Sequence, residues 1–100
     1  MGYETNYQVS VDDSSIRLDD ELESVSKYSG WDNGFLGAIK WYDHDADMRK
    51  LSKQWPKATF TVHGEGEDNL DLWDEHFVNG KMQRCEAVIT YPQFDKRRLR

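Results

Sequence analysis

The stretch from residue 40 to residue 80 constrains the fold most, because it carries a helix signal and a hairpin signal with sharp ends. Asp43 precedes a segment with apolar residues at helical spacing, and Pro56 ends it because proline cannot continue a helix. Those apolar residues are Met48, Leu51 and Trp55. Asn79-Gly80 is the strongest short signal for a tight turn between antiparallel strands. The stretch therefore predicts a helix followed by paired strands.

The rest of the chain supplies further strands and one more helix. In residues 3–11, tyrosine, threonine and valine alternate with polar residues, which predicts a strand with one buried face. Apolar residues at Leu18, Leu22 and Val25 predict a helix from about Asp19 to Tyr28, with acidic residues in its first turns. Further strands are expected over 35–42 and 58–63, and as two hairpin arms within 70–91.

Two of the predicted strands have alternatives. Residues 64–69 form an acidic loop or a bulged continuation of the strand before it. Residues 70–76 also fit a helical spacing, but we favour a strand that places Trp73 and Phe77 on one face.

The faces of the remaining strands follow from alternation. In the strand over 35–42, Phe35, Ile39 and Trp41 share a face with Gly37, where we expect a bend or bulge. In the second hairpin arm, the expected core-facing residues are Cys85, Ala87 and Ile89.

The order strand, helix, strand, helix and three strands predicts one domain over residues 1–95. Two helices of this length cover one face of a single, mainly antiparallel sheet, which is an α+β two-layer sandwich. Residues 96–100 hold four basic side chains, and we expect a flexible basic tail there. One cysteine, no apolar run of membrane-spanning length and no secretion signal predict a cytoplasmic protein outside the membrane.

Charge limits the classes of partner. The chain has 19 acidic and 13 basic residues, a net charge of −6, and only nine of the basic residues precede residue 96. An acidic body repels nucleic-acid phosphates, so nucleic-acid binding is disfavoured and a basic protein partner is favoured. Solubility alone is the simplest alternative explanation.

Several patterns resemble metal or nucleotide motifs without completing them. Asp43, Asp45 and Asp47 begin like a calcium loop, but Met48 and Gln54 stand where an EF-hand needs glycine and glutamate. The segment after residue 63 has two glycines at nucleotide-loop spacing but no third. His44, His63 and His76 lack zinc-ligand spacing. We therefore predict no catalytic residue, no metal site and no cofactor.

A series of carboxylates with one aromatic residue is the predicted partner-binding surface. Its members are Asp43, Asp45, Asp47, Glu65, Glu67, Asp68, Asp71, Trp73 and Asp74. In such a patch, the aromatic residue provides binding energy and the charges provide orientation. The alternative is an ordinary solvated face.

The same stretch resembles a group of small proteins encoded by bacteriophages and prophages. The shared pattern consists of WYDH at residues 41–44, DM at 47–48, GEGE at 64–67, D-L-W at 71–73 and NGK at 79–81. The resemblance implies a ferredoxin-like fold and a phage origin, and it brings no catalytic residue, cofactor or substrate.

From origin and charge we expect a phage-encoded protein that binds and inhibits a basic host protein in the bacterial cytosol. The expected target is a defence component such as CRISPR-Cas, with DNA mimicry as one form of inhibition. The alternatives are a small nucleic-acid or nucleotide-binding module and a metal-assisted hydrolase. A homodimer stays open, because a long exposed edge strand allows two sheets to pair.

Overall fold

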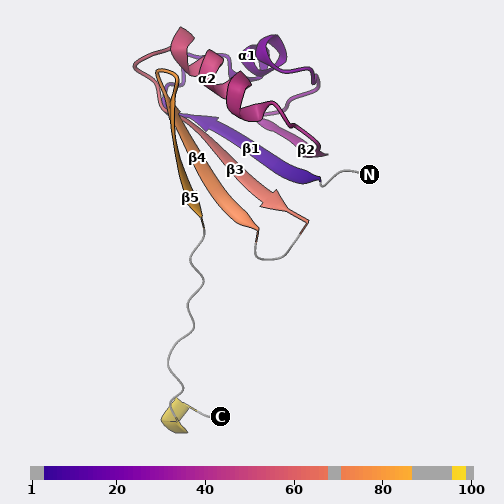
Figure 1. The fold of residues 1–100 in the computed structure, drawn as a ribbon, viewed down its shortest axis with the longest axis vertical. Coiled ribbons are helices and arrows are strands. Elements are labelled where there is room, and N and C mark those ends of the chain that lie inside the picture. Colours follow the sequence, from indigo (N-terminus) through magenta and orange to yellow (C-terminus); the bar gives the residue numbers. More distant parts are fainter. Residues whose placement is uncertain (1–3, 68–70, 87–95, 99–100) are drawn as a thin grey trace.

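In the residues described by the computed structural model, 4–67, 71–86 and 96–98, two helices cover one face of a five-stranded antiparallel sheet (Figure 1). The elements are β1 (Thr5–Val11), α1 (Leu18–Val25), β2 (Phe35–Ile39), α2 (His44–Gln54), β3 (Phe60–Gly66), β4 (Leu72–Val78), β5 (Lys81–Glu86) and a 3-10 turn, η1 (Lys96–Arg98). Neither α1 nor α2 is long and apolar enough to cross a membrane, and no other helix in the described ranges is.

The sheet order is β2-β1-β3-β4-β5, and all neighbouring strands are antiparallel. This confirms the predicted α+β class and the order β-α-β-α-β-β-β, and it is consistent with a ferredoxin-like sandwich. β1 and β3 lie at the centre of the sheet, while β2 and β5 form its edges. The far ends of β3, β4 and β5 extend beyond the helices (Figure 1). The helices therefore cover only part of the sheet.

Alternation along the central strands builds the core. Thr5, Tyr7 and Val9 of β1 are buried, and the residues between them are exposed, as predicted. β3 continues to Gly66 without a register shift, so residues 64–66 extend the strand as one alternative predicted, but they form no bulge. The core consists of Tyr7, Val9, Ile16, Leu22, Trp31, Trp41, Met48, Leu51, Ala58, Phe60, Val62, Trp73 and Phe77. Three of the four tryptophans thus lie in the interior.

The tight turn fixes the faces of the hairpin. Asn79 and Gly80 have φ angles of 48° and 79°, which a type I′ turn requires. The turn places Met82 opposite the buried Phe77, so the even-numbered residues of β5 face the helices. The predicted core position of Cys85 is therefore wrong, because this thiol lies on the exposed face. Ala87 and Ile89 lie outside the described residues.

A bulge in β2 changes which of its side chains face the core. The register shifts by one residue of β2 between the pairs that Gly37 and Phe35 form with β1. Gly37 has φ of 103°, a conformation that favours glycine. As a result Phe35 is 44% exposed, opposite an exposed residue of β1, and it does not share the face of Ile39 and Trp41. The predicted bulge is confirmed and the predicted face of Phe35 is wrong.

The helices form where predicted but with small differences at their ends. α1 ends at Val25 and not near Tyr28, because Ser26 is extended and its hydroxyl donates to the carbonyl of Leu22. Asp43 stands at the start of α2, but its side chain makes no capping hydrogen bond. At the other end Trp55 is 37% exposed, so it only partly continues the buried stripe of the helix.

Gly64 marks a close approach inside the sheet, and it provides a test of the packing. A Cβ atom at this position would overlap the indole ring of Trp73 on the neighbouring strand. Gly64→Ala should therefore destabilise the protein by about 1–3 kcal/mol, since the ring has to move within a packed core. Urea unfolding checks this value, with Ser10→Ala on the exposed face as the control. Equal midpoints for the two variants would contradict the described packing.

Candidate functional site

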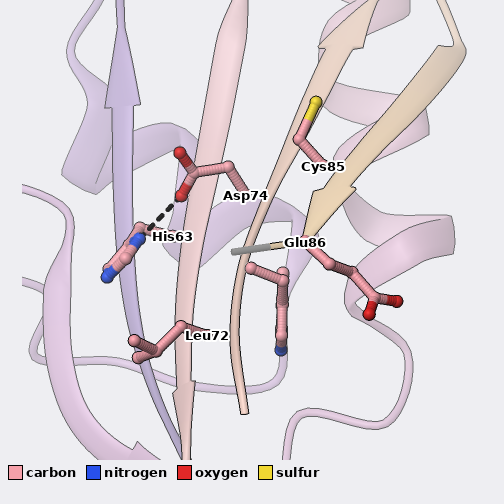
Figure 2. A pocket seen from close by; sticks show the side chains of 6 residues that line it. His63, Leu72, Asp74, Cys85 and Glu86 are labelled. Atoms are coloured by element: carbon pink, nitrogen blue, oxygen red, sulfur yellow. Dashed lines mark hydrogen bonds and ion pairs between the residues drawn. The ribbon is translucent and has the colours of Figure 1, made fainter. Parts of the chain in front are cut away.

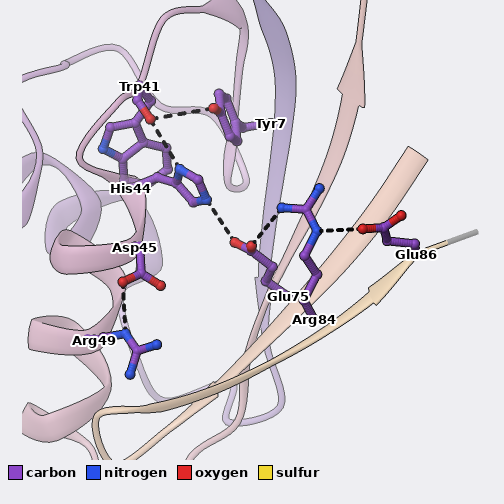
Figure 3. A network of polar contacts seen from close by, with 8 residues as sticks. All are labelled: Tyr7, Trp41, His44, Asp45, Arg49, Glu75, Arg84 and Glu86. Carbon is purple, nitrogen blue, oxygen red and sulfur yellow. Dashed lines mark hydrogen bonds and ion pairs between the residues drawn. The ribbon is translucent and has the colours of Figure 1, made fainter. Parts of the chain in front are cut away.

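A buried carboxylate lies at the centre of a polar network that joins α2, β4 and β5 (Figure 3). Glu75 of β4 is only 3% exposed. Its Oε1 atom lies 2.7 Å from Nε2 of His44, and its Oε2 atom accepts a hydrogen bond of 3.1 Å from Nη1 of Arg84. Both carboxylate oxygens therefore have a partner, which a buried carboxylate needs to offset its loss of water.

His44 connects this carboxylate to the first turn of α2. Its Nδ1 atom lies 3.2 Å from the carbonyl oxygen of Trp41, so both ring nitrogens face oxygen acceptors. The imidazole stacks on the indole of Trp73, with centroids 5.5 Å apart and an angle of 30° between the planes. These contacts fix the ring orientation and place the start of α2 over β4.

Aromatic rings pack against His44 and Arg84 of the network. The guanidinium carbon of Arg84 lies 4.7 Å from the Trp73 ring centroid, a cation–π distance, so Trp73 is covered by His44 and by Arg84. The Tyr7 ring packs edge-on against Trp41 and Trp73. Burial raises the pKa of the Tyr7 hydroxyl above its usual value. Both ring nitrogens of His44 and both carboxylate oxygens of Glu75 have partners within the chain.

One sequence pattern indicates this network although it belongs to no metal or nucleotide motif. Alternation placed Trp73 and Phe77 on the inner face of β4, and Glu75 lies between them at the same period of two. The same turn that exposes Cys85 brings Arg84 onto that face, directly opposite Glu75. A carboxylate within a buried stripe predicts a nearby cation.

Three of the predicted partner-binding carboxylates lie at the start of α2. Asp43 is exposed. Asp45 forms an ion pair of 2.9 Å with Arg49 one turn later. Asp47 accepts a hydrogen bond of 2.8 Å from the indole nitrogen of Trp41. Two of these three carboxylates therefore already have partners within the chain.

The other predicted members lie on the sheet and the connection between β3 and β4. Glu65 and Asp74 flank His63 on the face opposite the helices, whereas Trp73 is 6% exposed on the inner face. Glu67 and Asp71 lie where β3 and β4 are connected, and Asp68 is outside the described residues. The structure thus divides the series into two groups, and Trp73 is covered, not presented at the centre of a patch.

The pair of carboxylates around His63 changes its titration. Nδ1 of His63 lies 2.6 Å from Asp74, and Nε2 lies 3.2 Å from Glu65. The hydrogen bond that His63 donates to Asp74 is the main cause that raises the pKa of the imidazole above 6.5; burial lowers the pKa by a smaller amount, and the contact with Glu65 raises it further. All three side chains are about half exposed, so water screens this interaction.

A shallow pocket of about 240 Å³ lies beside this pair (Figure 2). Its lining residues are His63, Leu72, Trp73, Asp74, Cys85 and Glu86. In the described ranges, no three His, Cys, Asp or Glu side chains are grouped so that they could hold a metal ion. Because Asp74 occupies the strand between His63 and Cys85, the imidazole does not face the thiol as a general base would.

Comparisons with known proteins do not assign this fold or its polar network to a family. No family model, curated protein or solved structure matches the chain. The resemblance to phage-encoded proteins therefore depends on the sequence pattern alone.

Removal of the charge on Glu75 should be costly. Glu75→Gln leaves Arg84 and His44 without their carboxylate, and we expect the free energy of unfolding to fall by about 2–3 kcal/mol. Glu23→Gln on α1 is the matched control, because Glu23 is exposed and its loss should cost less than about 0.5 kcal/mol. Urea titrations of both variants measure the difference. Two equally small effects would show that the buried network does not stabilise the fold.

The raised pKa of His63 predicts a pH-dependent contribution to stability with a definite sign. A histidine whose pKa is higher in the folded state contributes its full stabilisation below the unfolded value of 6.5 and loses it as pH rises through the folded value. Asp74→Asn should therefore destabilise the protein at pH 6 more than at pH 9, and should lower the pKa of His63. An NMR titration of the imidazole checks this; an unchanged pKa in Asp74→Asn would contradict it.

Proposed function

We propose that this protein acts by binding a basic surface of another protein, and that it carries out no bond-making chemistry. The main support is a group of carboxylates at the corner of the sheet where β3 passes to β4. Glu67 accepts a hydrogen bond of 3.0 Å from the backbone of Glu4, and the carbonyl of Asp71 accepts one of 2.9 Å from the backbone of Gly66. With Glu65 nearby, these residues form what we call the acidic corner: Glu4, Glu65, Glu67 and Asp71.

Five of the nine basic residues of the folded body lie at the opposite end of the sheet, whereas Lys40 follows Ile39, which pairs with Thr5 near the acidic corner. These five lie on the second half of α2, just after it, or after the β4–β5 turn: Arg49, Lys50, Lys53, Lys57 and Lys81. Arg49 and Ser52 of α2 form hydrogen bonds to Gly80 in that turn. Since β4 is seven residues long, about 20 Å of strand separates this end from the acidic corner. The corner is left with a local excess of negative charge.

The interior network favours a binding role over a reactive one. Both oxygens of Glu75 have partners, and Trp73 is covered by His44 and Arg84. On the described part of the open face, a base could stack on Phe35, His63 or His76, but Glu65 and Asp74 lie beside His63 and would repel phosphates, so charge still disfavours the nucleic-acid alternative. What the protein offers a partner is charge and shape.

The origin implied by the sequence pattern gives this binding its biological setting. In that setting the partner is a host protein of the bacterial cytosol, the best candidate is a defence component, and binding inhibits it. A protein with a DNA-binding groove is the most specific form of this proposal, since carboxylates can occupy the positions of phosphates.

Charge reversal at the acidic corner tests the proposal. Glu65→Lys/Glu67→Lys should lose partners that the wild-type protein captures from bacterial lysate, because electrostatic complementarity orients the complex. The matched control, Asp20→Lys/Glu23→Lys on exposed positions of α1, changes the net charge equally and should retain them. Captured complexes should also weaken as salt rises. Equal capture by both charge-reversed proteins would contradict the assignment of the corner.

A further inference from the structure

One imidazole joins the acidic corner to the middle of the open sheet face. Nε2 of His63 lies 3.2 Å from the carboxylate of Glu65, which belongs to the corner, and Nδ1 lies 2.6 Å from Asp74 on the neighbouring strand. The imidazole points toward Asp74 in the shorter of these contacts (Figure 2). His63 therefore contacts one carboxylate inside the corner and one outside it.

Both contacts are hydrogen bonds only while His63 carries two ring hydrogens. In neutral imidazole one nitrogen keeps its hydrogen and the other presents a lone pair. A lone pair that faces a carboxylate oxygen is repelled by it, so one of the two carboxylates has to turn away when the proton is lost. Proton loss thus forces a choice between Asp74 and Glu65.

The geometry favours the contact with Asp74. Asp74 lies directly opposite His63 in the register of β3 and β4, and its contact is the shorter one, at 2.6 Å against 3.2 Å. The Glu65 side chain is longer and is 54% exposed, so it turns readily into water. Its neighbours across the sheet, Asn6 and Leu72, bear no charge. Glu65 is therefore the carboxylate that proton loss releases.

The other strands add no second carboxylate of this kind within the described part of the sheet. The remaining titratable or polar groups around His63 are an amide, a second imidazole and a thiol: Gln8 of β1, His76 of β4 and Cys85 of β5. None of the three pairs with Glu65 across the sheet. The local charge beside Glu65 therefore changes mainly through His63.

We propose that protonation of His63 controls how much negative charge the acidic corner offers to a basic partner. The protonated imidazole holds Glu65 and offsets its charge, whereas the neutral imidazole keeps its hydrogen on Nδ1 and leaves Glu65 free. The pairing of Thr5 with Gly66 places Glu4 opposite Glu67, so a released Glu65 adds to carboxylates that already lie together. This control concerns the surface of the proposed function and rests on it.

The sign of the pH dependence follows from the titration of His63. Because its pKa is raised above 6.5, the imidazole is protonated at pH 6 and becomes neutral as pH rises through the raised value. Affinity for a basic partner should therefore increase with pH. By linkage, a cation bound at the corner lowers the pKa of His63.

Nitrogen-15 NMR of the imidazole tests the choice between the two carboxylates without any partner. Above the pKa, the remaining hydrogen of His63 should lie on Nδ1, which faces Asp74. Glu65→Gln should leave the hydrogen there, because Asp74 determines its position. A hydrogen on Nε2 would overturn the proposal, since Glu65 would then be the carboxylate that His63 retains.

Calorimetry with decalysine measures the effect on binding, because lysine side chains stay charged at pH 6 and at pH 8.5. Affinity of the wild-type protein should rise roughly threefold between these pH values, the effect of a unit charge about 6 Å away in water. His63→Gln and Glu65→Gln should each remove most of this rise. The matched control is His76→Gln on the same sheet face, where Nδ1 contacts the Thr61 hydroxyl at 3.0 Å, and it should retain the rise.

A charge-reversed protein separates the two ways in which this account fails. Equal binding of decalysine by the wild-type protein and by Glu65→Lys/Glu67→Lys would contradict the proposed function, and with it the control by His63. Binding that Glu65→Lys/Glu67→Lys weakens, but whose rise with pH is the same in His63→Gln as in the wild type, would overturn the control alone. Circular dichroism verifies that each variant folds.

Discussion

A buried carboxylate holds the helix layer of this protein to its sheet. Glu75 projects from β4 into the interior, where His44 from the first turn of α2 and Arg84 from β5 each satisfy one of its oxygens. Burial of an unpaired carboxylate costs several kcal/mol, so the fold is stable only if all three residues keep this arrangement. One side chain of the β4–β5 hairpin thus contacts both its neighbouring strand and α2, which lies thirty-one residues earlier in the sequence.

The network also determines what the surface can do. Trp73 is covered by His44 and Arg84, and Trp41 donates its indole hydrogen bond to Asp47, so these aromatic residues contribute to stability and not to an exposed binding patch. The positive charge of Arg84 is used inside the chain as well. The described surface near the end of β3 carries Glu4, Glu65 and Glu67, and these carboxylates are the physical basis for the basic partner that we propose.

The fold was largely predictable because its signals are local. The alternation in β1, the proline after α2 and the Asn79-Gly80 turn each act within a few residues, and each prediction is confirmed. The two wrong predictions, for the faces of Cys85 and Phe35, depend on the register between neighbouring strands. The predicted core position of Cys85 is wrong because alternation along one strand does not show which face is buried, and the pairing of Phe77 with Met82 places Met82 on the core face. Phe35 was misplaced for the same reason, since a bulge cannot be located from one strand alone.

The site was much less predictable than the fold. Nothing in the sequence near Glu75 shows that His44, thirty-one residues earlier, will reach it. The measurement that tests the central role of this contact most directly is a double-mutant cycle with His44→Gln and Glu75→Gln, monitored by urea unfolding. A coupling energy of about 1–3 kcal/mol is the result that this account predicts. Additive effects, equal within about 0.5 kcal/mol, would show that helix and sheet are held together by other contacts.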